Sequence, residues 1–354
     1  MRQRDESPSP QTYRYSVAGE ISRSIDELLQ QLAPYPHLDL LREVFVTGVK
    51  LAQENCTRGD LKIVRTSIKE LRYGFKLFCA YKDVPKISMF GSARVLPEDP
   101  EFKAAAEFAR RMTGHGYKII TGAGPGIMAA GHQGAGVDNS FGLNILLPFE
   151  QEANPIILGD RKLINFFYFF TRKLFFIKES DAIVLMPGGF GTQDEGFEAL
   201  TLIQTGKNEP TPIVMLDRPG GTYWKSWYRF VWNELFQRGY VSLEDEKLFV
   251  ITESIDEACE EIRTFYRRYH SMRYVDRRQK LVIRLKEEVS PAVIEKLNED
   301  FQDIIAGQNR IETCQPFPEE REDLDVLDLP RIVFPFDQRH FGRLRELIDA
   351  INRA

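Results

Sequence analysis

A glycine-rich turn and a carboxylate lie close together between Pro187 and Glu195, and this pairing suits chemistry on a phosphorylated sugar. The apolar run 182–186 before the turn is typical of a strand buried in a parallel sheet. Thr192 is expected to begin a helix whose first N–H groups lack internal partners. The glycines, which let the backbone turn tightly and approach a ligand closely, are Gly188, Gly189 and Gly191. The segment therefore predicts a cradle for a phosphate group.

Glu195 is expected in the first turn of that helix, close to where a bound anion would lie. Like charges repel each other, so this carboxylate cannot hold the phosphate itself. It can face the adjoining sugar, where it would bind hydroxyls, stabilise a cationic transition state or activate water. The alternative is purely structural, because a strand–turn–helix can use glycines for geometry and an acid to complement the helix dipole.

The nine residues from Pro187 to Glu195 match the PGGxGTxxE signature of the LOG family of nucleotide phosphoribohydrolases. Arg172 and Lys173 resemble the paired Arg-Lys of that family, at the same separation from the glutamate. The resemblance covers about 86–270 and is to the longer bacterial type, whose members often carry a lysine decarboxylase label. It implies a Rossmann-like α/β sheet and cleavage of the N-glycosidic bond of a nucleoside 5'-monophosphate, such as AMP or a cytokinin riboside monophosphate.

The same resemblance implies roles for individual residues. Glu195 and Arg172 are the expected catalytic pair. The alternative for Arg172 is one more solvated cation on a helix, but its placement relative to Glu195 argues against that alternative. Neither a metal nor another cofactor is implied, and the expected assembly is a homodimer or a higher homo-oligomer. The expected substrate-binding residues are Gly91, Ser92, Arg94, Gly124, Asn144, Glu150, Lys173, Pro187, Gly188, Gly189, Gly191 and Thr192.

Two rival functions use the same fold. The chain could carry a nucleotide without cleaving it, or it could be a regulatory protein in which the C-terminal domain responds to a bound nucleotide. The presence of both Glu195 and Arg172 favours hydrolysis over either rival.

Gly91, Ser92 and Arg94 follow the first expected strand, residues 87–90. Open α/β sheets bind ligands at the carboxyl ends of their strands, so these residues are well placed for a site. The second expected strand, 117–121, also ends at this edge of the sheet, so the loop after it is equally well placed for a site.

The glycine-rich loop 122–128 follows that second strand and resembles the corresponding turn of the LOG family, with Ala123 where a glycine is usual. Its GxGxG spacing is not a dinucleotide fingerprint, because no acid ends a strand about 20 residues further on. A third expected strand, 141–147, carries Asn144 and ends near Glu150. This last segment either lines the site or is a plain strand end.

Composition limits the other possibilities. The 354 residues include 47 basic and 52 acidic side chains, and the net charge of −5 gives no electrostatic reason to expect nucleic acid. The four cysteines and five histidines show no metal-binding spacing, which favours reduced thiols. No apolar stretch is long enough to span a membrane, and the N-terminus lacks a signal-peptide pattern. We therefore expect a cytoplasmic protein with no membrane partner.

The pattern of apolar residues divides the chain into four parts. We expect a flexible tail over 1–19, a helical extension over 20–84, a Rossmann-like catalytic domain over 85–273, and a small α+β domain over 276–354. The helices of the extension pack either on the sheet or on a partner subunit. Because the recognised site residues all lie upstream of Arg273, we expect a chain ending there to fold.

Overall fold

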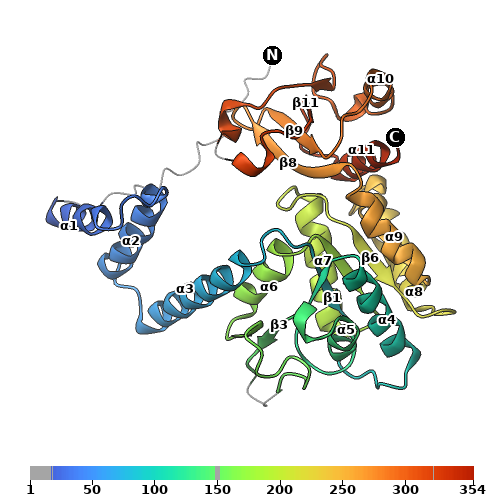
Figure 1. The fold of residues 1–354 in the computed structure, drawn as a ribbon, viewed down its shortest axis with the longest axis horizontal. Helices are drawn as coiled ribbons and strands as arrows, with labels where there is room; N and C mark the ends of the chain where they lie inside the picture. The colour runs from blue at the N-terminus through green and yellow to red at the C-terminus, as the bar shows by residue number, and fades with distance from the viewer. Residues whose placement is uncertain (1–16, 18, 148–151, 322) are drawn as a thin grey trace. The chain divides into compact units, whose positions relative to one another are not determined.

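The computed structural model of the chain describes residues 17, 19–147, 152–321 and 323–354 (Figure 1). The predicted flexible tail and Glu150 of the predicted site lie outside the described residues, apart from Val17 and Gly19 in the tail. Within the part that is described, the chain forms two compact units, one up to Leu71 and the other over Arg72–Ala354.

The first unit consists of helices, which confirms the predicted helical extension. α1 (Gly19–Gln30) packs against α2 (Leu38–Gln53), and α3 (Arg58–Cys79) begins in this unit and continues into the second. A small apolar core joins α1 and α2. It contains Val17, Ile25, Leu29 and Val46.

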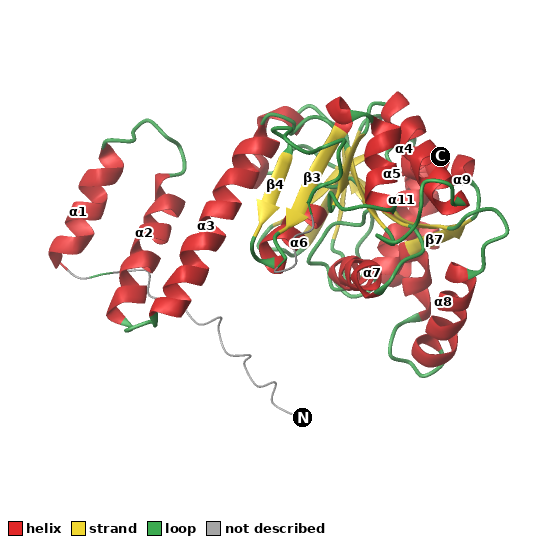
Figure 2. Cartoon of the chain, turned by 90° about the horizontal axis from the view of Figure 1, so that it is seen from below, coloured by secondary structure: helices red, strands yellow, loops and turns green. Residues whose placement is uncertain are grey.

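The second unit contains a parallel sheet of seven strands among its described residues, in the order β4-β3-β2-β1-β5-β6-β7. Helices flank this sheet (Figure 2), so the predicted Rossmann-like fold is confirmed. The strands are β1 (Lys86–Phe90), β2 (Lys118–Thr121), β3 (Ser140–Ile145), β4 (Leu163–Phe166), β5 (Ala182–Leu185), β6 (Ile213–Leu216) and β7 (Phe249–Thr252). The helices are α4 (Pro100–Gly114), α5 (Ile127–Ala135), α6 (Phe169–Lys178), α7 (Phe190–Gln204), α8 (Tyr223–Val231) and α9 (Ile255–Phe265).

The direction of strand addition reverses between β1 and β5. After β1 the chain adds β2, β3 and β4 on one side, and it then crosses to add β5, β6 and β7 on the other. At such a reversal the loops after the two central strands diverge and leave a crevice at their carboxyl ends. The loops after β1 and β5 are the two that the sequence marks as ligand-binding.

The central strands are buried on both faces, as the unbroken apolar run of β5 predicts, although β1 also contains the buried polar residues Lys86 and Ser88. Every residue of β1 and of β5 is buried, and Ile87, Met89 and Val184 belong to the main core beneath α4 and α5. Burial on both sides fixes the strand ends rigidly, because a shift in register would move apolar side chains out of the core.

The strand β4 at the edge of the sheet was not predicted. Its residues begin the almost unbroken apolar window Leu163–Phe170. In the structure it pairs with β3 and then leads into α6, while Phe167, Phe169 and Phe170 remain exposed. The window thus mixes a buried strand with an exposed aromatic surface.

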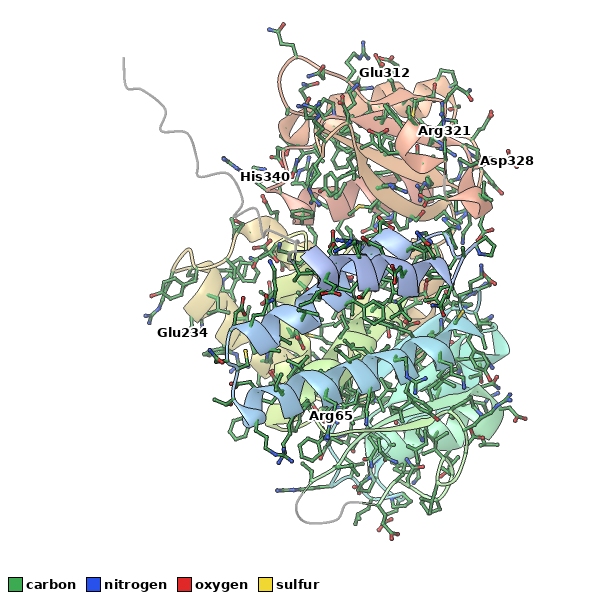
Figure 3. All side chains as sticks on the ribbon, turned by 90° about the vertical axis from the view of Figure 1, so that its left-hand side faces the viewer. Arg65, Glu234, Glu312, Arg321, Asp328 and His340 are labelled. Atoms are coloured by element: carbon green, nitrogen blue, oxygen red, sulfur yellow. The ribbon has the colours of Figure 1, made fainter. Side chains whose placement is uncertain are left out.

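The C-terminal part forms the predicted α+β domain (Figure 3). Over the described residues its antiparallel sheet has four strands in the order β10-β11-β9-β8. The strands are β8 (Tyr269–Val275), β9 (Lys280–Leu285), β10 (Glu312–Thr313) and β11 (Arg331–Phe334), and the helices are α10 (Pro291–Asp300) and α11 (Phe341–Arg353).

Strand β8 was not predicted from the sequence. The predicted boundary at Arg273 falls inside this strand, which pairs with β9 in the second sheet. The turn between them places Asp276, Arg277 and Arg278 at positive φ (52°, 53° and 68°). No glycine or asparagine marks that turn in the sequence, so the usual hairpin signal is missing.

The two sheets of this unit share buried contacts. Phe265 of α9 lies in the core of the C-terminal sheet, and a Cβ on Gly206, just after α7, would come within 2.1 Å of Phe341. Glu209, which follows α7, accepts hydrogen bonds from the Tyr269 hydroxyl (3.0 Å) and the Met272 N–H (3.3 Å). Burial raises the pKa of this carboxyl, and the two hydrogen bonds oppose the rise. The C-terminal domain therefore packs directly on the helix that carries Glu195.

A chain ending at Arg273 is accordingly expected to be insoluble, contrary to the expectation from sequence. The cut leaves β8 without β9 and exposes Phe265 and Tyr269, whose burial contributes roughly 2 kcal/mol each. The loss of the remaining shared core adds to this, against a typical total stability of about 5–15 kcal/mol. Soluble yield and light scattering of the truncated and full chains measure the effect. A soluble, active, monodisperse product would show that the two sheets fold independently.

Candidate active site

A cleft of about 760 Å³ lies at the strand reversal between β1 and β5. Its walls come from the segments after β1, β2 and β5, and from α6 and the start of α8. The lining includes the predicted residues Gly91, Ser92, Arg94, Arg172, Gly188, Gly189, Gly191, Thr192 and Glu195. The fold thus brings together residues that are about 100 positions apart in the sequence.

The three glycines after β5 have different structural roles. A Cβ on Gly188 would come within 2.1 Å of the Thr192 hydroxyl and 3.0 Å of the Ser92 nitrogen, so this glycine is required by packing. Gly189 and Gly191 meet nothing within 4 Å. Their open sides leave room for a ligand to approach the backbone.

The helix after this turn begins earlier than predicted. α7 starts at Phe190 with Gly189 as its N-cap, so the prediction that Thr192 begins the helix is wrong by two residues. Glu195 therefore lies in the second turn, not the first. The two additional helical residues are Phe190 and Gly191, since a glycine can enter the first turn of a helix although it disfavours the interior.

Free N–H groups face no protein acceptor at the start of α7. Among the described residues, no hydrogen bond is formed by the backbone N–H of Gly189 or of Gly191. Unpaired donors at a helix N-terminus, together with the helix dipole, attract an anion. The turn consequently has the open space, the donors and the field that a phosphate group requires.

Glu195 is a buried carboxylate with spare hydrogen-bonding capacity. Its side chain is about 6% exposed, and its Oε2 atom has no hydrogen-bond partner among the described residues. Burial raises the pKa of Glu195 to about 7, while the positive charges of Lys173 and Arg172 oppose the rise. An unpartnered buried carboxylate oxygen is costly, and a donor from a ligand in the cleft would satisfy it.

Lys173 supports this carboxylate from outside the cleft. Its ammonium nitrogen lies 3.6 Å from Glu195 Oε2, 3.0 Å from Asp194 Oδ2 and 2.6 Å from Glu198 Oε2. Because three acidic side chains of α7 surround it, Lys173 ties α6 to α7. The predicted substrate-binding role of Lys173 is therefore indirect in this structure, since it does not line the cleft.

Arg172 does line the cleft and has unused donors. Its guanidinium carbon lies 4.9 Å from the ring centre of Phe169 and 5.5 Å from that of Phe176. Its Nε atom is buried without a hydrogen-bond partner among the described residues. Burial lowers the pKa of Arg172, and Glu195 and Asp194 oppose the shift, so the side chain remains a cation.

Several predicted residues lie beside the cleft and not in its lining. The Pro187 carbonyl accepts a hydrogen bond from the Ser92 N–H (3.0 Å) and so joins the loops after β1 and β5. Asn144 is buried in β3 and donates to Asn165 Oδ1 (2.9 Å). Gly124 accepts a hydrogen bond at its carbonyl from Asn154 Nδ2 (3.1 Å). These residues shape the neighbouring loops.

A buried polar network under loop 122–126 was missed by the sequence analysis. His132 bonds the Thr121 hydroxyl (3.0 Å) and the side chain of Asn154, and burial lowers the pKa of His132. Thr121 and Asn154 in turn bond the backbone of Ala123. Ala123 has a φ of 61°, so it keeps the left-handed conformation that a glycine adopts more easily. No local sequence pattern identifies such a network, because its members are distant in the chain.

Other residues of the lining carry no motif either. Phe90, Met128, Phe169 and Phe176 give the cleft an apolar wall, and Tyr223 comes from the first turn of α8. The sequence signal that could have identified Tyr223 as a lining residue is its position shortly after the carboxyl end of β6. No group of three or more metal-ligating side chains occurs in the described part of the chain.

A parallel sheet with helices on both faces and a cleft where the strand order reverses is a doubly wound α/β fold of the Rossmann-like class. Comparison with known proteins is more specific. Residues 124–262 match the family described as "Possible lysine decarboxylase". The chain is 28% identical over 164 residues to a cytokinin riboside 5'-monophosphate phosphoribohydrolase of Mycobacterium tuberculosis, covering 44% of this chain and 81% of that protein.

Similar proteins occur in other organisms. A probable cytokinin riboside 5'-monophosphate phosphoribohydrolase of Oryza sativa subsp. japonica is 25% identical over 166 residues, covering 46% of this chain and 75% of that protein. A solved molybdenum cofactor binding protein from Rippkaea orientalis is 19% identical with a TM-score of 0.37, covering 51% of this chain and 96% of that one. The sequence matches confirm the resemblance to the LOG family. Separately, none of the described helices is long and apolar enough to cross a bilayer.

Proposed function

We propose that this protein hydrolyses the N-glycosidic bond of a nucleoside 5'-monophosphate, such as AMP or a cytokinin riboside monophosphate, to the free base and ribose 5-phosphate. One observation carries the proposal: the buried carboxylate of Glu195, whose Oε2 has no hydrogen-bond partner among the described residues, lies in the same cleft as the open glycine turn. A ligand that binds the glycine turn must carry an anionic group. To contact Glu195 at the same time, it must also carry a nearby hydroxyl or a centre that becomes positively charged. The phosphorylated ribose of a nucleotide has this combination.

The reaction breaks the bond between C1' and the base nitrogen and forms a bond between C1' and the oxygen of water. The base leaves with the bonding electron pair and takes up a proton, and the sugar passes through an oxocarbenium-like state. Glu195 is the group that stabilises this positive charge and orients or deprotonates the water. Arg172 donates to the bound nucleotide from the facing wall, where its Nε is otherwise unpaired.

The phosphate contributes to catalysis from a distance. Anchored at the turn 188–192, it supplies binding energy that holds the ribose against Glu195. Free nucleosides lack this anchor and are expected to be poor substrates.

We also propose that copies of the chain associate. The resemblance to the LOG family implies at least a homodimer, and an exposed apolar surface lies next to the cleft. Its residues are Phe167, Phe169, Phe170 and Leu174.

The proposed function is tested by incubating the pure protein with AMP, GMP, IMP, CMP and UMP. Chromatography of the free base and of ribose 5-phosphate should show equal amounts of both products. Adenosine is the control for the phosphate requirement. Tight binding of AMP without any release of base would contradict hydrolysis and favour a carrier.

The rate is expected to depend on pH through Glu195. Because its charged form stabilises the sugar cation and its pKa is about 7, kcat/KM should rise with pH up to about 7 and level off above it. At pH 6 about one tenth of the plateau value should remain. The phosphate of the substrate also titrates, near pH 6, and could change binding over the same pH range. The Kd for ribose 5-phosphate, measured at each pH, is the control for this effect. A value of kcat/KM that falls as pH rises would instead assign the active form to the protonated acid.

A further inference from the structure

Tyr223 makes contacts at both ends of the phosphate-binding turn. Its hydroxyl donates a hydrogen bond to the Gly188 carbonyl (2.5 Å) and accepts one from Gln193 Nε2 (2.7 Å). Gly188 and Gln193 immediately precede and follow the segment 189–192. One hydroxyl group therefore connects the two ends of the segment that presents the unpaired N–H groups.

These contacts fix the direction of a donor. In a trans peptide the C=O of Gly188 and the N–H of Gly189 point in opposite directions. Holding the carbonyl in place therefore fixes the N–H of Gly189, which has no acceptor among the described residues. The bond from Gln193 holds the start of α7 against the same hydroxyl.

Tyr223 is itself held by the end of β6. Its backbone N–H donates to Asp217 Oδ2 (2.9 Å), and Asp217 is only 3% exposed. A Cβ on Gly221 would come within 2.1 Å of Asp217 Oδ1, so the chain passes closely over this carboxylate. The backbone at Tyr223 is thus anchored to the residue that follows β6, and β6 pairs with β5, the strand that leads into the turn.

From these contacts we infer that Tyr223 is a positioning residue, which preorganises the turn 188–192 for the phosphate of the substrate. This inference rests on the proposed function and deepens it. Tyr223 acts on the phosphate anchor and not on the bond that breaks. Its loss should therefore weaken ligands that carry a phosphate and leave the others unaffected.

The test is the variant Tyr223→Phe, which removes only the hydroxyl. We expect the KM for AMP and the calorimetric Kd for ribose 5-phosphate to rise about tenfold, with kcat lowered less than about threefold. The Kd for adenosine should not change. If the Kd for ribose 5-phosphate is unchanged, or if the affinities for ribose 5-phosphate and adenosine fall equally, the inference is overturned.

Tyr228→Phe is the matched control. Tyr228 lies in the same helix, and its hydroxyl also donates a hydrogen bond, in this case to the carboxylate of Glu246, but Tyr228 does not line the cleft. This variant should bind ribose 5-phosphate as the wild type does.

The binding measurements also separate the inference from the proposed function. A wild type that binds AMP without cleaving it refutes hydrolysis, while a weaker Kd in Tyr223→Phe still supports the role of Tyr223. A wild type that binds neither AMP nor ribose 5-phosphate refutes both.

Discussion

Replacing Glu195 by glutamine is expected to lower kcat for AMP by about a hundredfold or more while leaving its Kd within a few-fold of wild type. The amide keeps the volume of the buried side chain and removes the charge that stabilises the oxocarbenium-like sugar, which corresponds to about 3 kcal/mol of barrier. Single-turnover rates and calorimetric binding of AMP measure the two quantities. Turnover close to wild type would refute the catalytic role of Glu195.

Glu198→Gln is the control for this variant. Glu198 lies one turn further along α7 and contacts the same ammonium group of Lys173, but it does not line the cleft. The substitution removes a comparable ion pair without removing the charge at the sugar. A loss of less than about tenfold in kcat is therefore expected. A loss equal to that of Glu195→Gln would show that the broken ion pair with Lys173, and not the missing charge at the sugar, lowers kcat.

The variant Glu195→Gln is also expected to stabilise the fold at neutral and alkaline pH. The folded-state pKa of Glu195, about 7, lies above the ordinary pKa of 4.5 for a glutamate, so the folded protein binds more protons than the unfolded chain between these two values. Its free energy of unfolding therefore falls as pH rises from about 4.5 to 7. Above pH 7 the buried charge costs on the order of 3 kcal/mol. Glu195→Gln removes this cost, and its melting temperature at pH 8 should exceed that of the wild type.

Replacing Gly189 by valine is expected to abolish binding of AMP without unfolding the protein. The backbone of Gly189 (φ −88°, ψ −156°) is close to conformations open to other residues, and a Cβ there meets nothing within 4 Å. The branched side chain would thus occupy the space expected for the phosphate. Calorimetric titration with AMP and a thermal melt measure binding and folding separately.

Two glycine variants serve as controls for Gly189→Val. Gly114→Val, at the end of α4, also places its Cβ in open space but lies outside the cleft, so binding should be unchanged. Gly188→Ala should instead destabilise the fold, since its Cβ would clash with Thr192. Unchanged affinity in Gly189→Val would place the phosphate elsewhere, at the loop 122–126.

Much of the site could be predicted from the sequence because its signals are local. The turn 187–192 needs glycines at fixed positions, and buried parallel strands need unbroken apolar runs, so both leave patterns in adjacent residues. The pairing of Arg172 with Glu195 came from a family motif of fixed spacing. The beginning of α7 was misplaced because glycines give the same signal in a turn and in a first helical turn.

The remaining errors have a common cause. Strand β8 was not predicted because its turn, 276–278, uses residues with left-handed backbone conformations that are not glycine. The network of Thr121, His132 and Asn154 and the contacts of Tyr223 join residues from separate elements. Hydrogen bonds between distant residues impose no regular spacing on the sequence.

The sequence by itself predicted the sheet class, which the structure confirms, and it pointed to the turn 187–192 and Glu195 as the candidate phosphate and sugar contacts, because each of these signals depends on residues next to one another. Only the tertiary structure decided the state of that carboxylate. The burial of Glu195 in the cleft, its distance of 3.6 Å from Lys173 and its raised pKa arise where α6 and α7 meet. The packing of the C-terminal domain on α7 was likewise decided in three dimensions, since desolvation and contact depend on which surfaces the fold brings together.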